Sequence, residues 1–302
     1  CKKTMPHKLF AHLAIIAANI LYAANYTIAK WVMPTYIKPF GFIFIRVLGA
    51  LVFFWLIHLF VQHEKIQKED YPRLFFCGMF GVAINQLMFF KGLDITTPVN
   101  ASLMMVTTPI LVIIIAILAK ADKFTWAKFA GILLGALGAV FILMGNDFNF
   151  KSSTALGDFF VFINATSYGI YLTIVKPLVR KYHALTIIKW VFLFGFIPVA
   201  IVGFPEFIQI DWQSFTPNTW WSLLYVVLGV TCFAYLFNIF ALSKVNPSVV
   251  GIYIYLQPLL AAVFAIYFGA DKFDAVKVLA ACCIFLGVYL VSFYKPKKLK
   301  TI

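Results

Sequence analysis

Charged side chains are scarce in this sequence, at 12% of 302 residues, whereas hydrophobic residues make up 63%. The mean hydropathy is +0.93. A soluble domain cannot keep that much apolar surface from water, so the composition excludes a soluble protein and indicates a polytopic membrane protein. The net charge of +14 could suggest a nucleic-acid partner, but the basic residues lie in short loops, where they report membrane orientation. We therefore expect membrane lipid, and no nucleic acid, as a partner.

Motifs for catalysis and for cofactor binding are also missing. The sequence has no His-Glu-x-x-His motif, no Gly-Lys-Ser/Thr phosphate loop and no Gly-x-Ser-x-Gly turn, and its five histidines do not cluster. We therefore expect no cofactor, no metal and no enzyme activity. A disulfide framework is not expected either, because four of the five cysteines lie within apolar runs: Cys77, Cys232, Cys282 and Cys283.

Acidic residues are absent from the middle of every hydrophobic run. All 11 aspartates and glutamates fall in loops or near the ends of runs. Proton-coupled membrane proteins commonly use a buried carboxylate as a relay, so this absence argues against proton coupling. Asp158, near the start of a run, is the remaining candidate for a coupling residue, although stabilising a helix N-terminus is a simpler role for it.

Ten hydrophobic runs are present, joined by short connections and without a soluble domain. About 20 apolar residues, each rising about 1.5 Å, cross a bilayer core. The sequence therefore predicts an all-α fold with ten transmembrane helices. Gly131, Gly135 and Gly138 in the fifth run have the spacing of small residues that lets helices approach closely. The runs cover roughly residues 9–30, 40–61, 73–91, 98–119, 127–145, 155–176, 185–204, 219–243, 247–268 and 274–294.

One stretch of the sequence occurs twice. Each copy begins with a polar residue and a proline, has a second proline within an apolar run, and ends in Ala-Asp-Lys-Phe. A constant separation over several landmarks indicates two related halves, which we place at residues 1–149 and 150–302. The landmarks, all separated by 149 residues, are Pro98 and Pro247, Pro109 and Pro258, Ala121 and Ala270, and Gly138 and Gly287.

The duplicated stretch has the features of a membrane-spanning helix. Thr97 and Asn246 precede the first prolines and are predicted to cap these helices with their side chains. Pro109 and Pro258 then fall near the middle of the membrane, where a proline frees a backbone carbonyl and kinks the helix. These kinks are either tolerated distortions or bends that flank a central site.

The distribution of lysine and arginine predicts the orientation. Most of the 25 basic residues fall in loops on the same side as the N-terminus, so both termini should be cytoplasmic. Five spans per half is an odd number, which means that the second half enters the membrane from the opposite side. Inverted five-helix repeats are typical of secondary transporters that bind a solute at the repeat interface and work by alternating access.

Polar side chains within the runs are candidates for a solute site, because they are expensive in a membrane. Residues three or four apart share a helix face, so several of them form polar stripes that would line a central cavity. Helix–helix hydrogen bonding is the alternative role for any one of them. The substrate-binding candidates are Tyr22, Asn25, Asn85, Gln86, Tyr168, Tyr171, Tyr235, Asn238, Tyr253 and Gln257, and the same stripes contain Asn19, Asn164 and Thr231.

Arg46 and Lys189 are the charged residues farthest from the loops. Each either extends to the membrane interface or pairs with a backbone carbonyl. The alternative is that they bind an anionic group, such as the carboxylate of a substrate.

Several ordered residues resemble a known family. The stretch Tyr22–Lys30 keeps the Asn25 and Lys30 of a motif near the family's start, and Arg46 matches its usual arginine in the second span. On these residues the chain resembles the drug/metabolite transporter superfamily, specifically its bacterial EamA-type members with ten helices. Further matches are Pro109, Pro258, Asn238, Ala241, Leu242, and the turns Ala121–Lys123 and Ala270–Lys272.

The chain departs from the family pattern at two places. Tyr22 and Ala23 stand where Trp-Gly is common, and Asp122 and Asp271 stand where glutamate is usual. The resemblance implies export of small metabolites, often amino acids or amphipathic compounds, through a central cavity in a bacterial inner membrane.

The sequence thus predicts a secondary transporter, an exporter or exchanger of small organic metabolites, as a monomer or homodimer. Two alternatives remain. A lipid-handling protein, either a flippase or a scaffold, would need a lateral opening between helices. An intramembrane enzyme is disfavoured because catalytic motifs are missing.

Overall fold

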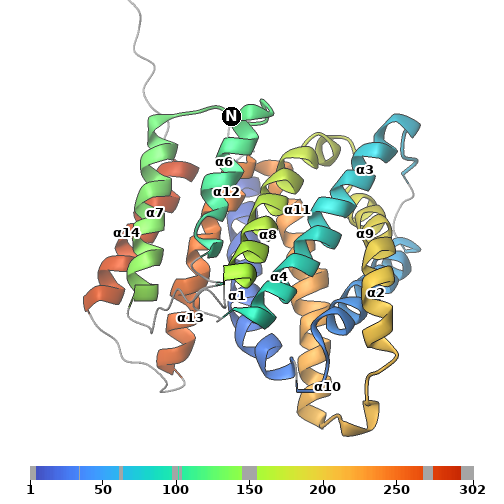
Figure 1. Ribbon diagram of the computed structural model, residues 1–302. Helices are drawn as coiled ribbons and strands as arrows, with labels where there is room; N and C mark the ends of the chain where they lie inside the picture. The colour runs from blue at the N-terminus through green and yellow to red at the C-terminus, as the bar shows by residue number, and fades with distance from the viewer. Residues whose placement is uncertain are drawn as a thin grey trace, which may run out of the picture.

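The computed structural model describes residues 5–33, 35–60, 64–96, 101, 104–144, 155–267 and 275–293. Within these ranges the regular structure is entirely helical, with no strand (Figure 1). This confirms the all-α prediction. The first half contains α1 (Met5–Val32), α2 (Pro39–His58), α3 (Tyr71–Gly78), α4 (Ile84–Ile95), α6 (Thr108–Leu118) and α7 (Trp126–Met144).

The second half contains a second series of helices. These are α8 (Ala155–Ile174), α9 (Ala184–Phe207), α10 (Pro217–Leu224), α11 (Ala234–Lys244), α12 (Pro247–Ile252), α13 (Leu256–Tyr267) and α14 (Ala275–Ser292). Short 3-10 turns, η1 (Lys68–Asp70), η3 (Leu178–Arg180) and η4 (Trp212–Ser214), occupy connections between them.

The lengths of the helices agree with a multi-pass membrane protein. Five described helical stretches are long and apolar enough to cross a bilayer, and five shorter apolar helices accompany them. Each of the ten predicted runs overlaps one of these stretches. The long ones are Pro39–His58, Lys68–Ile95, Ala155–Arg180, Ala184–Phe207 and Pro217–Lys244, and the shorter ones are Leu9–Asn25, Thr108–Leu118, Trp126–Phe141, Pro247–Leu260 and Val278–Ser292.

The third span of each half contains a π-helical segment. η2 (Met79–Ala83) joins α3 to α4, and the longer η5 (Tyr225–Phe233) joins α10 to α11. A π-helical turn inserts extra residues and leaves local carbonyls open to other donors, and such turns are frequent at functional sites. The hydrophobic runs predicted these spans but gave no sign of the π segments within them.

The fourth span of each half is interrupted rather than continuous. A turn at residues 106–107 precedes α6, and Pro109 lies in the first turn of that helix. In the second half, the 3-10 turn η6 (Tyr253–Tyr255) precedes α13, which begins two residues before Pro258. A proline cannot donate an intrahelical hydrogen bond, so each one lies where a new helix begins. The Thr107 hydroxyl donates to the Met104 carbonyl at 2.6 Å beside the first break.

Matching helices of the two halves pack against each other, and they do so antiparallel. A Cβ added at Gly131 in α7 would lie 2.7 Å from the Gly287 oxygen in α14, and one at Gly138 would lie 2.6 Å from the Ala280 oxygen. Residues later in α7 therefore contact residues earlier in α14, so the two helices run antiparallel. The close approach confirms the predicted role of the glycine spacing.

The pair α2 and α9 is antiparallel as well. The Glu206 carboxylate, near the end of α9, accepts hydrogen bonds from Phe40 N at 2.8 Å and Gly41 N at 3.0 Å, at the start of α2. Glu64, which follows α2, accepts from His183 N at 2.8 Å, at the start of α9. Glu206 thus caps the N-terminus of α2, whereas Glu64 holds His183, whose own side chain caps α9 by accepting from Leu185 N.

These pairs frame the bundle. In Figure 1, α7 and α14 lie side by side at one edge, and α2, α3 and α9 lie at the opposite edge. Between them, α1 packs against α11 and α4 packs against α8.

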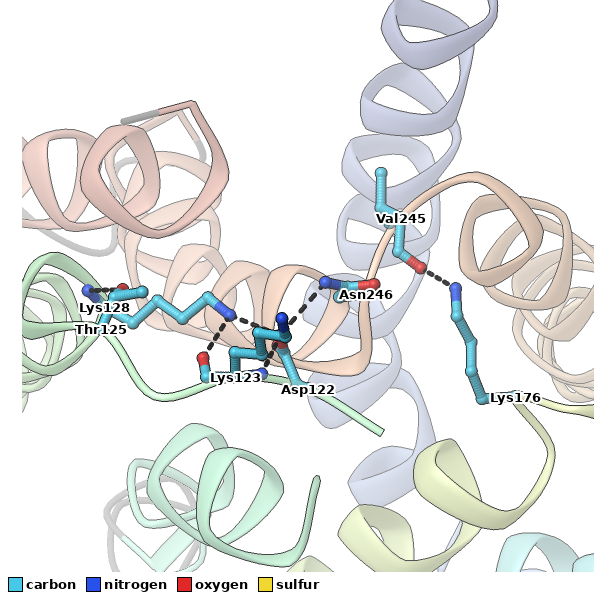
Figure 2. A network of polar contacts seen from close by, with 7 residues as sticks. All are labelled: Asp122, Lys123, Thr125, Lys128, Lys176, Val245 and Asn246. Atoms are coloured by element: carbon cyan, nitrogen blue, oxygen red, sulfur yellow. Dashed lines mark hydrogen bonds and ion pairs between the residues drawn. The ribbon is translucent and has the colours of Figure 1, made fainter. Parts of the chain in front are cut away.

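A polar network joins the halves at one end of the bundle (Figure 2). The sequence predicts that the Asn246 side chain caps α12, and this prediction is wrong. Asn246 does precede α12, but its amide donates to Asp122 Oδ1 at 3.1 Å instead. Lys128 also donates to Asp122 Oδ1. Lys176 Nζ donates to the carbonyls of Leu242 and Val245. The other predicted cap, at Thr97, lies outside the described residues.

Candidate functional site

A cavity lies between helices of both halves. Its volume is about 100 Å³. Its walls come from α1, α2, α4, α8, η5, α11, α12, η6 and α13. The residues that line it are Asn19, Tyr22, Asn25, Arg46, Asn85, Gln86, Phe89, Phe90, Met105, Asn164, Tyr168, Val230, Tyr235, Asn238, Val250, Ile254 and Gln257.

Most of the predicted substrate-binding residues meet in this cavity. The polar stripes of α1, α8 and α11 face one another there, because α1 packs on α11 and α4 packs on α8. The predicted residues at the cavity wall are Tyr22, Asn25, Arg46, Asn85, Gln86, Tyr168, Tyr235, Asn238 and Gln257.

Two residues far apart in the sequence bond directly at the cavity wall. Gln86 Nε2 donates to the Tyr235 hydroxyl at 3.2 Å, and the two positions are 149 residues apart, the same separation as the landmarks of the sequence. The Tyr235 hydroxyl then donates to the Gly81 carbonyl at 2.9 Å. Gly81 lies in η2, where the π-helical geometry makes its carbonyl available.

Other amides join neighbouring helices. Asn238 Nδ2 donates to the Tyr22 hydroxyl at 3.0 Å, which links α11 to α1. Gln257 Nε2 donates to Asn19 Oδ1 at 3.0 Å, which links α13 to α1. Polar residues at the cavity therefore fix the positions of the surrounding helices as well as lining the space between them.

The link between α4 and α8 is reciprocal. Asn164 Nδ2 donates to the Asn85 carbonyl at 2.7 Å, and Asn85 Nδ2 donates to the Asn164 carbonyl at 3.4 Å. Ser167 donates to the Phe80 carbonyl in η2 nearby. The Nδ2 group of each asparagine thus bonds to the backbone of the neighbouring helix.

Arg46 is the cation at the cavity wall. Its side chain is 3% exposed, and Nε donates to Thr231 Oγ1 at 3.1 Å. The guanidinium carbon lies 4.6 Å from the centre of the Phe90 ring and 5.8 Å from that of Phe42. A desolvated cation–π contact of this kind contributes about 2 kcal/mol, which offsets part of the cost of burying the charge.

Three predicted site residues lie away from the cavity. The Lys189 ammonium is buried over Trp55, 4.9 Å from its ring centre, so this cation is held by aromatic faces. The Tyr171 ring packs where a Cβ at Gly81 would lie. The Tyr253 hydroxyl bonds to His12 Nδ1 at 2.8 Å.

The apolar part of the wall was not predicted from the sequence. Phe89 and Phe90 lie three and four residues after Gln86, so the helical period of α4 could have placed them on the same face. The other apolar lining residues carried no comparable signal. They are Met105, Val230, Val250 and Ile254.

None of the described residues that line the cavity is an aspartate or a glutamate. Asp158 Oδ1 accepts a hydrogen bond from Thr96 Oγ1 near the start of α8, and Asp158 does not line the cavity. Asp70 pairs with Lys181 at 2.9 Å. The described residues also contain no group of three or more His, Cys, Asp and Glu side chains that could hold a metal ion.

Comparison with known proteins identifies the family. The profile of the EamA-like transporter family matches twice, over residues 9–144 and 155–293. The chain belongs to the EamA-like transporter family. This EamA-like protein is therefore a multi-pass membrane transporter of the drug/metabolite transporter superfamily. Membership of a transporter family implies that the protein moves small molecules and is surrounded by lipid.

Relatives span nearly the whole EamA-like chain. An uncharacterized transporter of Archaeoglobus fulgidus is 27% identical over 291 residues, covering 93% of this chain and 96% of the relative. Protein WALLS ARE THIN 1 of Arabidopsis thaliana is 22% identical, covering 98% of this chain and 86% of the relative. A crystal structure at 16% identity superposes with a TM-score of 0.76 over 93% of this chain and 95% of its own, which establishes the shared fold.

Proposed function

We propose that this transporter moves small organic metabolites across a bacterial inner membrane, as an exporter or exchanger, by alternating access through the cavity. The observation that carries the proposal is the polar cavity enclosed by helices of both halves. Oriented amide and hydroxyl groups with apolar walls are the usual composition of a site for a small solute.

Inverted repeats, residues 1–149 and 150–302, provide the route between two access states. The antiparallel packing of α7 with α14 and of α2 with α9 supports opposite polarity of the halves. The separate family matches to residues 9–144 and 155–293 support the duplication. Exchanging the conformations of two such repeats would open the same cavity to either side of the membrane in turn.

The network of Asp122, Lys128 and Asn246 belongs to the closing device in this proposal. It ties the loop before α7 to the residue before α12, so it bridges the halves (Figure 2). The lysine bias supports a cytoplasmic position for this end and for both termini. Breaking the network would accompany opening of the cavity toward the cytoplasm.

Transport should proceed by facilitated diffusion or exchange. None of the described residues lining the cavity is acidic, so the site offers no carboxylate to carry a coupling proton. The matched test is an imposed pH gradient on proteoliposomes: strong uphill flux that depends on the gradient would contradict this part of the proposal.

A metabolite screen followed by transport assays tests the proposal. Metabolites are first screened for a rise in thermal stability of the full-length protein in detergent, because a ligand that binds the folded state stabilises it. Hits are then measured as flux into proteoliposomes. We expect Asn25→Ala, Tyr168→Ala and Tyr235→Ala each to reduce saturable flux about tenfold or more, because each removes a polar group of the site.

Tyr253→Phe is the matched control, because that hydroxyl lies outside the cavity. Unchanged flux in all three cavity variants would remove the site assignment. Movement of phospholipid between leaflets without solute flux would instead favour the lipid-handling alternative.

A further inference from the structure

We propose that the substrate carries a carboxylate group, and that Arg46 binds it. This inference rests on the proposed carrier function and adds a substrate class to it. Arg46 lines the cavity and is almost fully buried. Its Nη1 atom is buried and makes no hydrogen bond within the described part of the chain. A buried cationic donor without a partner, at the wall of a solute cavity, is a site for an anionic acceptor.

No counter-charge for Arg46 is present among the described residues. The three ion pairs found there join Lys91 to Asp94, Lys128 to Asp122, and Lys181 to Asp70. The carboxylate of Glu206 caps α2. Arg46 lacks a counter-charge and also lines the cavity, so the missing negative charge is assigned to the solute.

The guanidinium is held in place before any ligand arrives. Nε donates to Thr231 Oγ1, and that hydroxyl donates to the Val226 carbonyl at 2.8 Å in η5. The Phe90 and Phe42 rings contact the guanidinium. Fixing the planar group in this way aims its remaining N–H donors and reduces the entropy lost on binding.

The rest of the wall narrows the substrate class. Arg46 is the single basic residue among the described cavity-lining residues, so the site suits one negative charge rather than a phosphate dianion. The amide oxygens of Asn25, Gln86 and Asn164 are buried without hydrogen-bond partners in the described structure. They would accept from N–H or O–H groups of the solute. The class is thus a monocarboxylate with an apolar body and hydrogen-bond donors.

Paired acids and amides test the charge directly. The probes are acetate, benzoate, 3-phenylpropanoate and phenylalanine, each compared with its primary amide, and the readout is thermal stability of the full-length protein in detergent. We expect at least one acid to stabilise the wild-type protein more than its amide does. In Arg46→Gln this preference should fall about tenfold or more in apparent affinity, and Arg46→Lys should keep part of it.

Lys189→Gln is the matched control, because it removes a buried cation that does not line the cavity, and it should leave the preference intact. Equal stabilisation by every acid and its amide in the wild-type protein would overturn the inference, even if Arg46→Gln fails to fold. So would an acid preference that persists in Arg46→Gln. Transport of a neutral metabolite, with no acid binding better than its amide, would contradict the carboxylate assignment but would still support the carrier function.

Discussion

At the scale of single residues, three groups of charged side chains in the described structure have different uses. Asp122 and Lys128 pair with each other where the halves meet. Glu206 caps a helix from the opposite half. Arg46 is buried at the cavity wall and forms no ion pair with any residue that the structure describes. We connect Arg46 with the solute because it lines the cavity and its buried Nη1 has no hydrogen-bond partner in the described structure.

The Glu206 cap gives a prediction at this scale. Glu206→Gln should lower the free energy of unfolding by about 1 kcal/mol, because the neutral amide is a weaker acceptor for Phe40 N and Gly41 N at a helix start. Thermal unfolding in detergent measures the effect. Glu69→Gln, at an exposed position, is the control and should leave the unfolding temperature unchanged. Equal effects of the two substitutions would show that the cap contributes no stability.

At the scale of elements, contacts between matching helices hold the bundle together. A Cβ at Gly287 would lie 2.5 Å from the Gly131 oxygen. Gly287→Ala should therefore separate α7 from α14 and lower the free energy of unfolding by about 1–3 kcal/mol. Gly229→Ala is the control, because its Cβ would make contacts of 3.4 Å and longer. A Gly287→Ala protein as stable as Gly229→Ala would mean that this close approach does not support the fold.

Hydrophobic runs predicted the helices well, because a membrane demands long apolar stretches. They could not reveal η2 and η5, since a π turn changes the register without changing hydrophobicity. The break at residues 106–107 was likewise hidden inside a continuous apolar run, although Pro109 marked its neighbourhood.

The sequence predicted a polar cavity, but it did not predict every residue that lines it. Polar side chains stand out in an apolar helix, which is why Asn25, Gln86 and Asn238 were found. Which way a helix is rotated depends on its partners, and the sequence alone does not give that. The sequence places Lys189 and Arg46 alike, each within an apolar run. In the structure, only Arg46 of the two lies at the described cavity wall, and Lys189 lies over Trp55.

At the scale of the whole molecule, two halves of opposite polarity are proposed to open one cavity to each side of the membrane in turn. The claim can be tested without knowing the substrate. A single cysteine at Val230, a near-isosteric change at the cavity wall, would report access in a variant whose native cysteines are replaced. A second variant adds cysteines at Asp122 and Asn246, whose side chains are bonded across the halves.

Labelling of Val230→Cys by a membrane-impermeant maleimide, applied from either side of oriented vesicles, is the most direct measurement. We predict labelling from both sides, and we predict that joining the two added cysteines with a short cross-linker abolishes labelling from the cytoplasmic side alone. Labelling from one side only, unchanged by the cross-link, would contradict alternating access.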